Sequence, residues 1–177
     1  MNAKAQTGHR VLHWVMAGLI FVLLGSGYYM TTESDYALYH WHKSVGIVVA
    51  SLLAGRIFYR LIRPWRSTVV GTREVAVRIY HWLLLAVILA MVLSGLSYSG
   101  FGGYGIALFG VELLPVNPGP GGEIVPLAAG LSDFGRNLHV TTGYLLLLLI
   151  AIHIGAALKH HFIDRDNTLV FMLKGRQ

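Results

Sequence analysis

Long apolar stretches separated by short polar ones dominate the chain. Four stretches are long and apolar enough to cross the roughly 30 Å hydrocarbon core of a bilayer as helices. They cover about residues 10–30, 40–62, 77–99 and 137–160. The pattern therefore predicts an all-α fold, a transmembrane four-helix bundle, with residues 1–177 forming one integral-membrane domain.

Composition agrees with a membrane protein and narrows its chemistry. Charged residues make up 12% of the chain, against about a quarter of a soluble domain, and 55% of residues are hydrophobic. The first apolar run is about 20 residues long and no small-residue cleavage site follows it, so we expect no signal peptide. The chain has no cysteine, which excludes disulfides, iron–sulfur clusters, zinc–thiolate sites and covalently attached haem.

The distribution of positive charge predicts the orientation in the membrane. Of the 14 lysines and arginines, only Lys43 and Arg136 flank the segments between the first and second spans and between the third and fourth. The others lie near the N-terminus, the 63–76 loop and the C-terminus. By the positive-inside rule both termini are expected in the cytoplasm. The net charge of +6 is thus a signal of topology, and we expect no nucleic-acid binding.

The last apolar stretch carries two histidines in its interior. His139 and His153 are 14 residues apart, which is about 40° short of four helical turns, so both side chains leave the same face. They are separated by roughly 21 Å along the axis, which places one near each surface of the membrane. Histidine inside a span is costly and calls for a function.

Histidines on the other spans match these two depths. His42 enters from the outside at the level of His139, whereas His13 and His81 lie near the inside at the level of His153. Two imidazoles facing each other across a bundle core are what a six-coordinate haem b needs. The pattern predicts an outer pair, His42 with His139, and an inner pair, His153 with either His13 or His81.

The two halves of the chain repeat each other, which predicts a duplicated helical hairpin. Arg, His, Trp, Ser and Gly of the first span recur in the third at an offset of 68, and His42-x-Ser-x-Gly46 recurs as His139-x-Thr-x-Gly at an offset of 97. Arg56 in the second span corresponds to His153 in the fourth. Gly27 lies on the face of His13 at the outer level, where the absence of a side chain lets a flat ring approach the backbone.

Charged residues beside these sites have two interpretations. Lys43 and Arg136 at the outer site either anchor helix ends or neutralise haem propionates and attract an anion. Arg10, Arg56 and Arg78 have the same alternatives at the inner site. A proton or metal pathway through the histidines is disfavoured because few carboxylates are available as partners.

The chain resembles the bacterial cytochrome b561 family, small four-helix di-haem proteins of the inner membrane, over nearly its whole length. The similarity rests on R-x-x-H-W at Arg10–Trp14, H-x-S-x-G at His42–Gly46, the spacing of His139 and His153, and the polar ending from Lys159 to Leu169. The resemblance implies two non-covalent haem b groups. It pairs His13 with His153 at the inner haem and His42 with His139 at the outer haem, and leaves His81 as a neighbour of the inner site.

The resemblance also implies a function. A well-understood type in this family oxidises superoxide at the periplasmic side and passes the electrons to ubiquinone. In this chain Lys43 and Arg136 would then attract superoxide, and His160, His81 and Arg78 are the candidates for supplying protons to quinone near the inner haem. The alternative is a quinone-coupled cytochrome b subunit that anchors a dehydrogenase or hydrogenase and takes electrons from a redox partner protein. A haem-free transporter is a third, less favoured hypothesis, because transporters place polar sites at mid-membrane.

Two segments outside the spans carry further expectations. The outer segment 100–136 is rich in Gly and Pro and is long enough to be functional; within it, residues 104–114 are expected to form a short interfacial helix. After the fourth span, Asn167 or Thr168 is expected to cap a short helix that runs through Leu173.

Overall fold

The computed structural model describes residues 3–62 and 72–175, so Arg63, Arg66 and Arg176 of the basic inner segments lie outside it. Four long helices form the body: α1 (Ala3–Glu33), α2 (Tyr39–Ile62), α3 (Thr72–Phe101) and α4 (Ala129–Phe162). Each is long and apolar enough to cross a membrane. The predicted four-helix architecture is confirmed, although α1 and α4 begin seven to eight residues earlier than their predicted spans.

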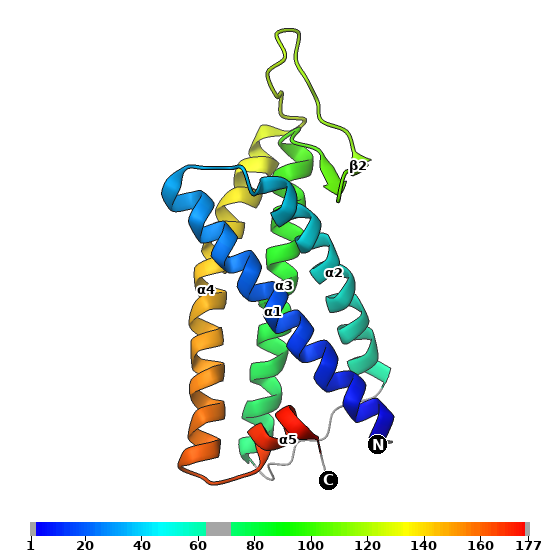
Figure 1. Ribbon diagram of the computed structural model, residues 1–177. Helices are drawn as coiled ribbons and strands as arrows, with labels where there is room; N and C mark the ends of the chain where they lie inside the picture. The colour runs from blue at the N-terminus through cyan, green and yellow to red at the C-terminus, as the bar shows by residue number, and fades with distance from the viewer. Residues whose placement is uncertain (1–2, 63–71, 176–177) are drawn as a thin grey trace.

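The helices pack as two hairpins, with α3 against α4 over most of their length and α1 crossing in front of them beside α2 (Figure 1). A small core forms at mid-depth, where each helix supplies an apolar side chain: Ile20, Val49, Val87 and Leu146 are all buried. Most other apolar side chains of the helices face outward, as expected where the surrounding solvent is lipid. This core separates the two levels at which the histidines lie.

Between α3 and α4 the structure forms a β-hairpin where a helix was expected. The strands β1 (Ile106–Leu108) and β2 (Val111–Leu114) pair antiparallel, so the prediction of a helix over 104–114 was wrong. Gly105 and Gly110 adopt φ values of 63° and 91°, which a right-handed helix does not accommodate. Phe109 and Gly110 instead form the two-residue turn with positive φ that short hairpins favour.

The hairpin docks on the outer end of α2. Lys43 Nζ donates to the carbonyl oxygens of Tyr104 and Gly105 at 3.1 and 2.8 Å. The buried hydroxyl of Ser44 lies 3.2 Å from the Ala107 carbonyl oxygen and accepts from the Phe109 amide at 2.9 Å. These contacts hold the β-hairpin against the bundle, while the loop that follows β2 projects beyond the ends of the helices (Figure 1).

A short helix closes the chain at the opposite end. Helix α5 (Thr168–Lys174) follows a turn after α4 and lies at the end of the bundle where α1 begins (Figure 1). Trp14 Nε1 donates to the Met172 carbonyl oxygen at 2.9 Å, and Arg10 Nη2 donates to that of Leu173 at 3.3 Å. Asn167 is the N-cap residue, as predicted, but its side chain makes no capping bond. Asp166 accepts from the Thr168 amide instead.

Candidate functional site

The structure brings His42 of α2 and His139 of α4 together at the outer level. Their ring centroids are 6.1 Å apart. Because imidazole nitrogens bond metals at about 2 Å, two rings on opposite sides of one metal ion have centroids roughly 6 Å apart. The separation of this pair therefore fits axial ligation of a haem iron.

A cavity of about 650 Å³ opens beside this outer pair. This size lies within the range of roughly 300–1,000 Å³ typical of cofactor and ligand pockets. The lining is mostly apolar and includes Gly27 and Gly46, the two glycines singled out in the sequence, with Gly95 as the counterpart of Gly27. The glycines remove side-chain bulk where a flat ring would approach the helices. The donor set and the cavity together fit haem b.

Both cations predicted at the outer site line the same cavity, since Lys43 and Arg136 reach it from α2 and α4. Among the described residues that line it, no carboxylate is present. Lys43 Nζ also lies 4.5 Å from the centroid of the Tyr39 ring, while Arg136 is exposed. The cavity thus combines an apolar wall with uncompensated positive charge at its outer rim, an arrangement that suits an anionic group.

Hydroxyl groups of α1 and α3 contact the outer histidines. Ser26 Oγ lies 2.9 Å from Nδ1 of His42, and Ser94 Oγ lies 3.3 Å from Nδ1 of His139. Ser26 and Ser94 are equivalent in the duplicated hairpin. The repeat was visible in the sequence, but the contacts were not, because they depend on how the helices cross.

The inner level gathers three histidines. The ring centroid of His153, on α4, lies 6.2 Å from that of His13 and 5.5 Å from that of His81. The first distance matches that of the outer pair, and His81 is a close neighbour. Spacing alone had left both candidates open, and the structure keeps both beside His153.

Two residues at the inner level had no assigned contact in the sequence. The ring of Tyr80 stacks on that of His153, with centroids 6.2 Å apart and an interplanar angle of 7°, and its hydroxyl donates to the Leu149 carbonyl oxygen. Arg56 Nη2 lies 3.4 Å from Nδ1 of His13. Arg56 was noted as the counterpart of His153, whereas nothing in the spacing pointed to Tyr80.

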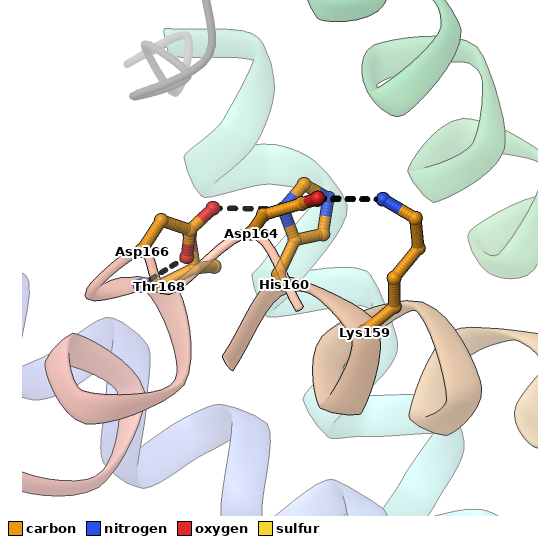
Figure 2. Close-up of polar contacts among 5 residues, drawn as sticks. All are labelled: Lys159, His160, Asp164, Asp166 and Thr168. Atoms are coloured by element: carbon orange, nitrogen blue, oxygen red, sulfur yellow. Dashed lines mark hydrogen bonds and ion pairs between the residues drawn. The ribbon is translucent and has the colours of Figure 1, made fainter. Parts of the chain in front are cut away.

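Three other predicted residues are engaged elsewhere. Arg10 contacts α5, as described above, and Arg78 forms an ion pair with Glu74 at 2.8 Å on its own helix. His160 lies at the end of α4, where Nδ1 is 2.7 Å from Asp166 and 3.3 Å from Asp164 (Figure 2). None of these contacts joins the three residues to the inner histidines.

The carboxylates around His160 form a polar cluster at the cytoplasmic end predicted for α4. Lys159 pairs with Asp164 at 2.7 Å, and Asp166 accepts from the Thr168 amide at 2.9 Å (Figure 2). Partial burial raises the pKa of the Asp166 carboxyl, but hydrogen bonds from Thr168 and His160 outweigh that effect and hold this pKa below its ordinary value. The cluster therefore favours an ionised Asp166 in the folded chain.

Comparison with known proteins places the chain among membrane cytochromes. Residues 5–175 match the family model described as prokaryotic cytochrome b561. The chain is 31% identical to cytochrome b561 homolog 2 of Escherichia coli (strain K12), over 91% of this chain and 86% of that protein. It is 30% identical to cytochrome b561 homolog 1 of the same organism, over 94% of each chain. A probable superoxide oxidase, CybB of Yersinia pestis, is 24% identical over 92% of this chain and 91% of that protein.

The match covers nearly all of the chain, all four apolar helices and both histidine levels. Members of this family are multi-pass membrane proteins that transfer electrons through b-type haem. The chain therefore belongs to the prokaryotic cytochrome b561 family.

Proposed function

We propose that this protein oxidises superoxide at the outer side of the bacterial inner membrane and reduces ubiquinone at the inner side, through two haem b groups. Two superoxide ions would each lose one electron and leave as dioxygen, while one quinone gains two electrons and two protons. The observation that carries the proposal is the outer cavity, whose described lining contains Lys43 and Arg136 and no carboxylate. The similarity to a probable superoxide oxidase supports the same substrate.

Four histidines are proposed as axial ligands. His42 and His139 would hold the outer haem, and His13 and His153 the inner one, with centroid separations of 6.1 and 6.2 Å. Haem bound in this way supplies one-electron redox chemistry. With histidines holding each haem iron from both sides, the substrate would react without binding the iron, so the protein's task would be to bring the anion close.

Lys43 and Arg136 are proposed to perform that task. A small anion is attracted along the field of cations at the mouth of an apolar cavity, where low-dielectric walls focus the potential. The contacts of Lys43 with Tyr104 and Gly105 support a fixed position for its charge. The two cations would also neutralise haem propionates, and both roles need the same placement at the outer rim.

Protons for quinone are proposed to come from the cytoplasmic side. His81 lies beside His153, at 5.5 Å between ring centroids, whereas His160 and Arg78 pair with carboxylates. Of the three candidates, His81 is the one in contact with the inner pair. His160 with Asp164 and Asp166 is proposed as a more peripheral proton-exchanging group.

The experiment is a visible spectrum of the purified oxidised protein. Superoxide should bring up the reduced b-type bands, and ubiquinone should then remove them. Bands that respond to dithionite but not to superoxide would favour the other hypothesis, an anchor subunit of a dehydrogenase that receives electrons from a partner protein. Co-purification of such a partner is the second observation that separates the two.

A further inference from the structure

His42 and His139 differ in what holds their Nδ1 atoms. The Ser26 hydroxyl donates to the Leu23 carbonyl oxygen at 3.0 Å, so its single hydrogen is engaged. Its oxygen is therefore left to accept from Nδ1–H of His42, at 2.9 Å. For His42 this serine is the partner that faces Nδ1 from the neighbouring helix.

His139 has a second and stronger constraint. Its Nδ1 lies 2.9 Å from the Met91 carbonyl oxygen, which can only accept, so Nδ1 carries the proton. Ser94 Oγ is farther from Nδ1, at 3.3 Å, and donates to the same Met91 carbonyl at 2.9 Å. The ring also lies closer to its glycine: a Cβ on Gly95 would be 3.0 Å from Cε1 of His139, whereas one on Gly27 would be 3.5 Å from Cε1 of His42.

We infer that Ser26 is a positioning residue for the outer haem, and that its counterpart Ser94 is not, because the Met91 carbonyl has taken over that role for His139. The inference rests on the proposed function only in that His42 and His139 ligate a haem. In both rings the protonated Nδ1 leaves Nε2 as the nitrogen that can bind iron. The duplicated hairpin thus contains the same Ser-Gly pair twice, Ser26–Gly27 and Ser94–Gly95, but only the hydroxyl of Ser26 is needed to position a histidine.

A hydrogen bond from Nδ1–H to an acceptor fixes the orientation of a metal-bound imidazole and makes it a better electron donor. Electron donation favours the ferric state over the ferrous state. Removal of the Ser26 hydroxyl should therefore raise the midpoint potential of the outer haem and loosen that haem. Loss of such a partner typically weakens metal binding about 10- to 100-fold.

The test compares Ser26→Ala with Ser94→Ala in the haem-loaded protein in detergent. Three quantities are measured: the midpoint potential of each haem by optical redox titration, the low-spin ferric EPR signals, and the rate of haem loss to excess apomyoglobin. Ser26→Ala should shift the potential of one haem upward, move one EPR signal and speed loss of one haem. Ser94→Ala should leave all three near wild type, and Ser26→Thr, which keeps a hydroxyl, should restore them.

Equal effects of the two alanine variants, or a larger effect of Ser94→Ala, would overturn the inference. So would a Ser26→Ala protein indistinguishable from wild type. His42→Ala provides the separate check on ligation, since it should remove the outer haem. If it does so while Ser26→Ala has no effect, the positioning role fails and the proposed function stands. If superoxide fails to reduce the haems while Ser26→Ala shifts the potential, the proposed function fails and the positioning role stands.

Discussion

Arg56 Nη2 lies 3.4 Å from Nδ1 of His13. Arg56 occupies the position in the first hairpin that corresponds to His153 in the second. A guanidinium has only donors, so in this contact Nδ1 of His13 accepts and the ring proton belongs on Nε2. Because a histidine that binds iron through Nε2 needs the proton on Nδ1, this contact and ligation by His13 exclude each other, and Arg56 would have to move away when His13 binds the haem. His81 differs, because its Nδ1 lies 2.7 Å from the Val77 carbonyl oxygen and must carry the proton. The inner level is therefore less symmetrical than the outer one.

The inner ligands can be identified by removing each imidazole in turn. His153→Ala and His13→Ala should each remove one haem and leave the outer haem in place, because the separation of their ring centroids, 6.2 Å, matches that of the outer pair. His81→Ala should keep both haems. The measurement is the haem-to-protein ratio by pyridine haemochromogen. Loss of a haem in His81→Ala together with retention in His13→Ala would transfer the ligand role to His81.

Gly95 tests whether the outer ring is as tightly held as the structure indicates. A Cβ at Gly95 would lie 3.0 Å from Cε1 and 3.2 Å from Nδ1 of His139, which forces the ring to move. Overpacking of this kind costs about 1–3 kcal/mol. Gly95→Ala should therefore lower the thermal unfolding midpoint and reduce occupancy of the outer haem.

Gly25→Ala is a matched control on α1, since a Cβ at Gly25 would have nothing within 4 Å. Its unfolding midpoint and haem occupancy should match wild type. Gly27→Ala, whose Cβ would lie 3.5 Å from Cε1 of His42, should have values between those of Gly25→Ala and Gly95→Ala. The packing argument is wrong if Gly95→Ala is tolerated as well as Gly25→Ala.

The charge of the outer cavity predicts a dependence on ionic strength. Lys43→Glu combined with Arg136→Glu should slow reduction of the haems by superoxide at low salt and weaken the dependence of the rate on salt, because screening acts on the attraction that the cations provide. Stopped-flow spectroscopy over a range of ionic strength gives both quantities. Lys174→Glu, which reverses one charge on α5 at the other end of the bundle, should leave them unchanged. A double variant as fast as wild type in low salt would refute steering of the anion.

The sequence predicted the four helices and the two histidine levels because both depend on properties that are local to a helix. Length and hydropathy define a span, and a separation of 14 residues fixes face and depth for His139 and His153 alike. Contacts between helices also depend on tilt and rotation. That is why the spacing did not separate His13 from His81 and gave no indication that Tyr80 stacks on His153.

The hairpin between α3 and α4 was missed for a different reason. Residues 104–114 are apolar in a way that suits a short helix, a strand or a membrane-surface segment equally well. The positive φ values of Gly105 and Gly110 exclude a continuous helix and favour the hairpin. The contacts of Lys43 and Ser44 with it come from α2, about 60 residues earlier in the chain. Contacts between residues so far apart in the chain cannot be predicted from the pattern of residues 104–114 alone.

Asp166 predicts that the end of the bundle formed by the α4–α5 turn responds to pH. Its pKa is lower in the folded chain than in the unfolded one, because hydrogen bonds from Thr168 and His160 outweigh partial burial. A carboxyl with a depressed folded pKa stabilises the fold above its unfolded pKa, and that contribution disappears as pH falls through the folded pKa. Asp166→Asn should remove the same contribution at neutral pH. In wild type, acidification should loosen the turn and α5 in the same way.

Hydrogen exchange of the α5 amides, measured for wild type and Asp166→Asn at matched pH, separates this effect from the intrinsic pH dependence of exchange. At pH 7 the variant should exchange faster, and the difference should shrink as pH falls into the acidic range where Asp166 becomes protonated in the folded chain. Asp133→Asn, at the outer end, should leave α5 unchanged. Identical exchange of the two proteins at pH 7 would mean that α5 is held by the contacts of Trp14 and Arg10 with its carbonyl oxygens, because those contacts do not depend on the charge of Asp166.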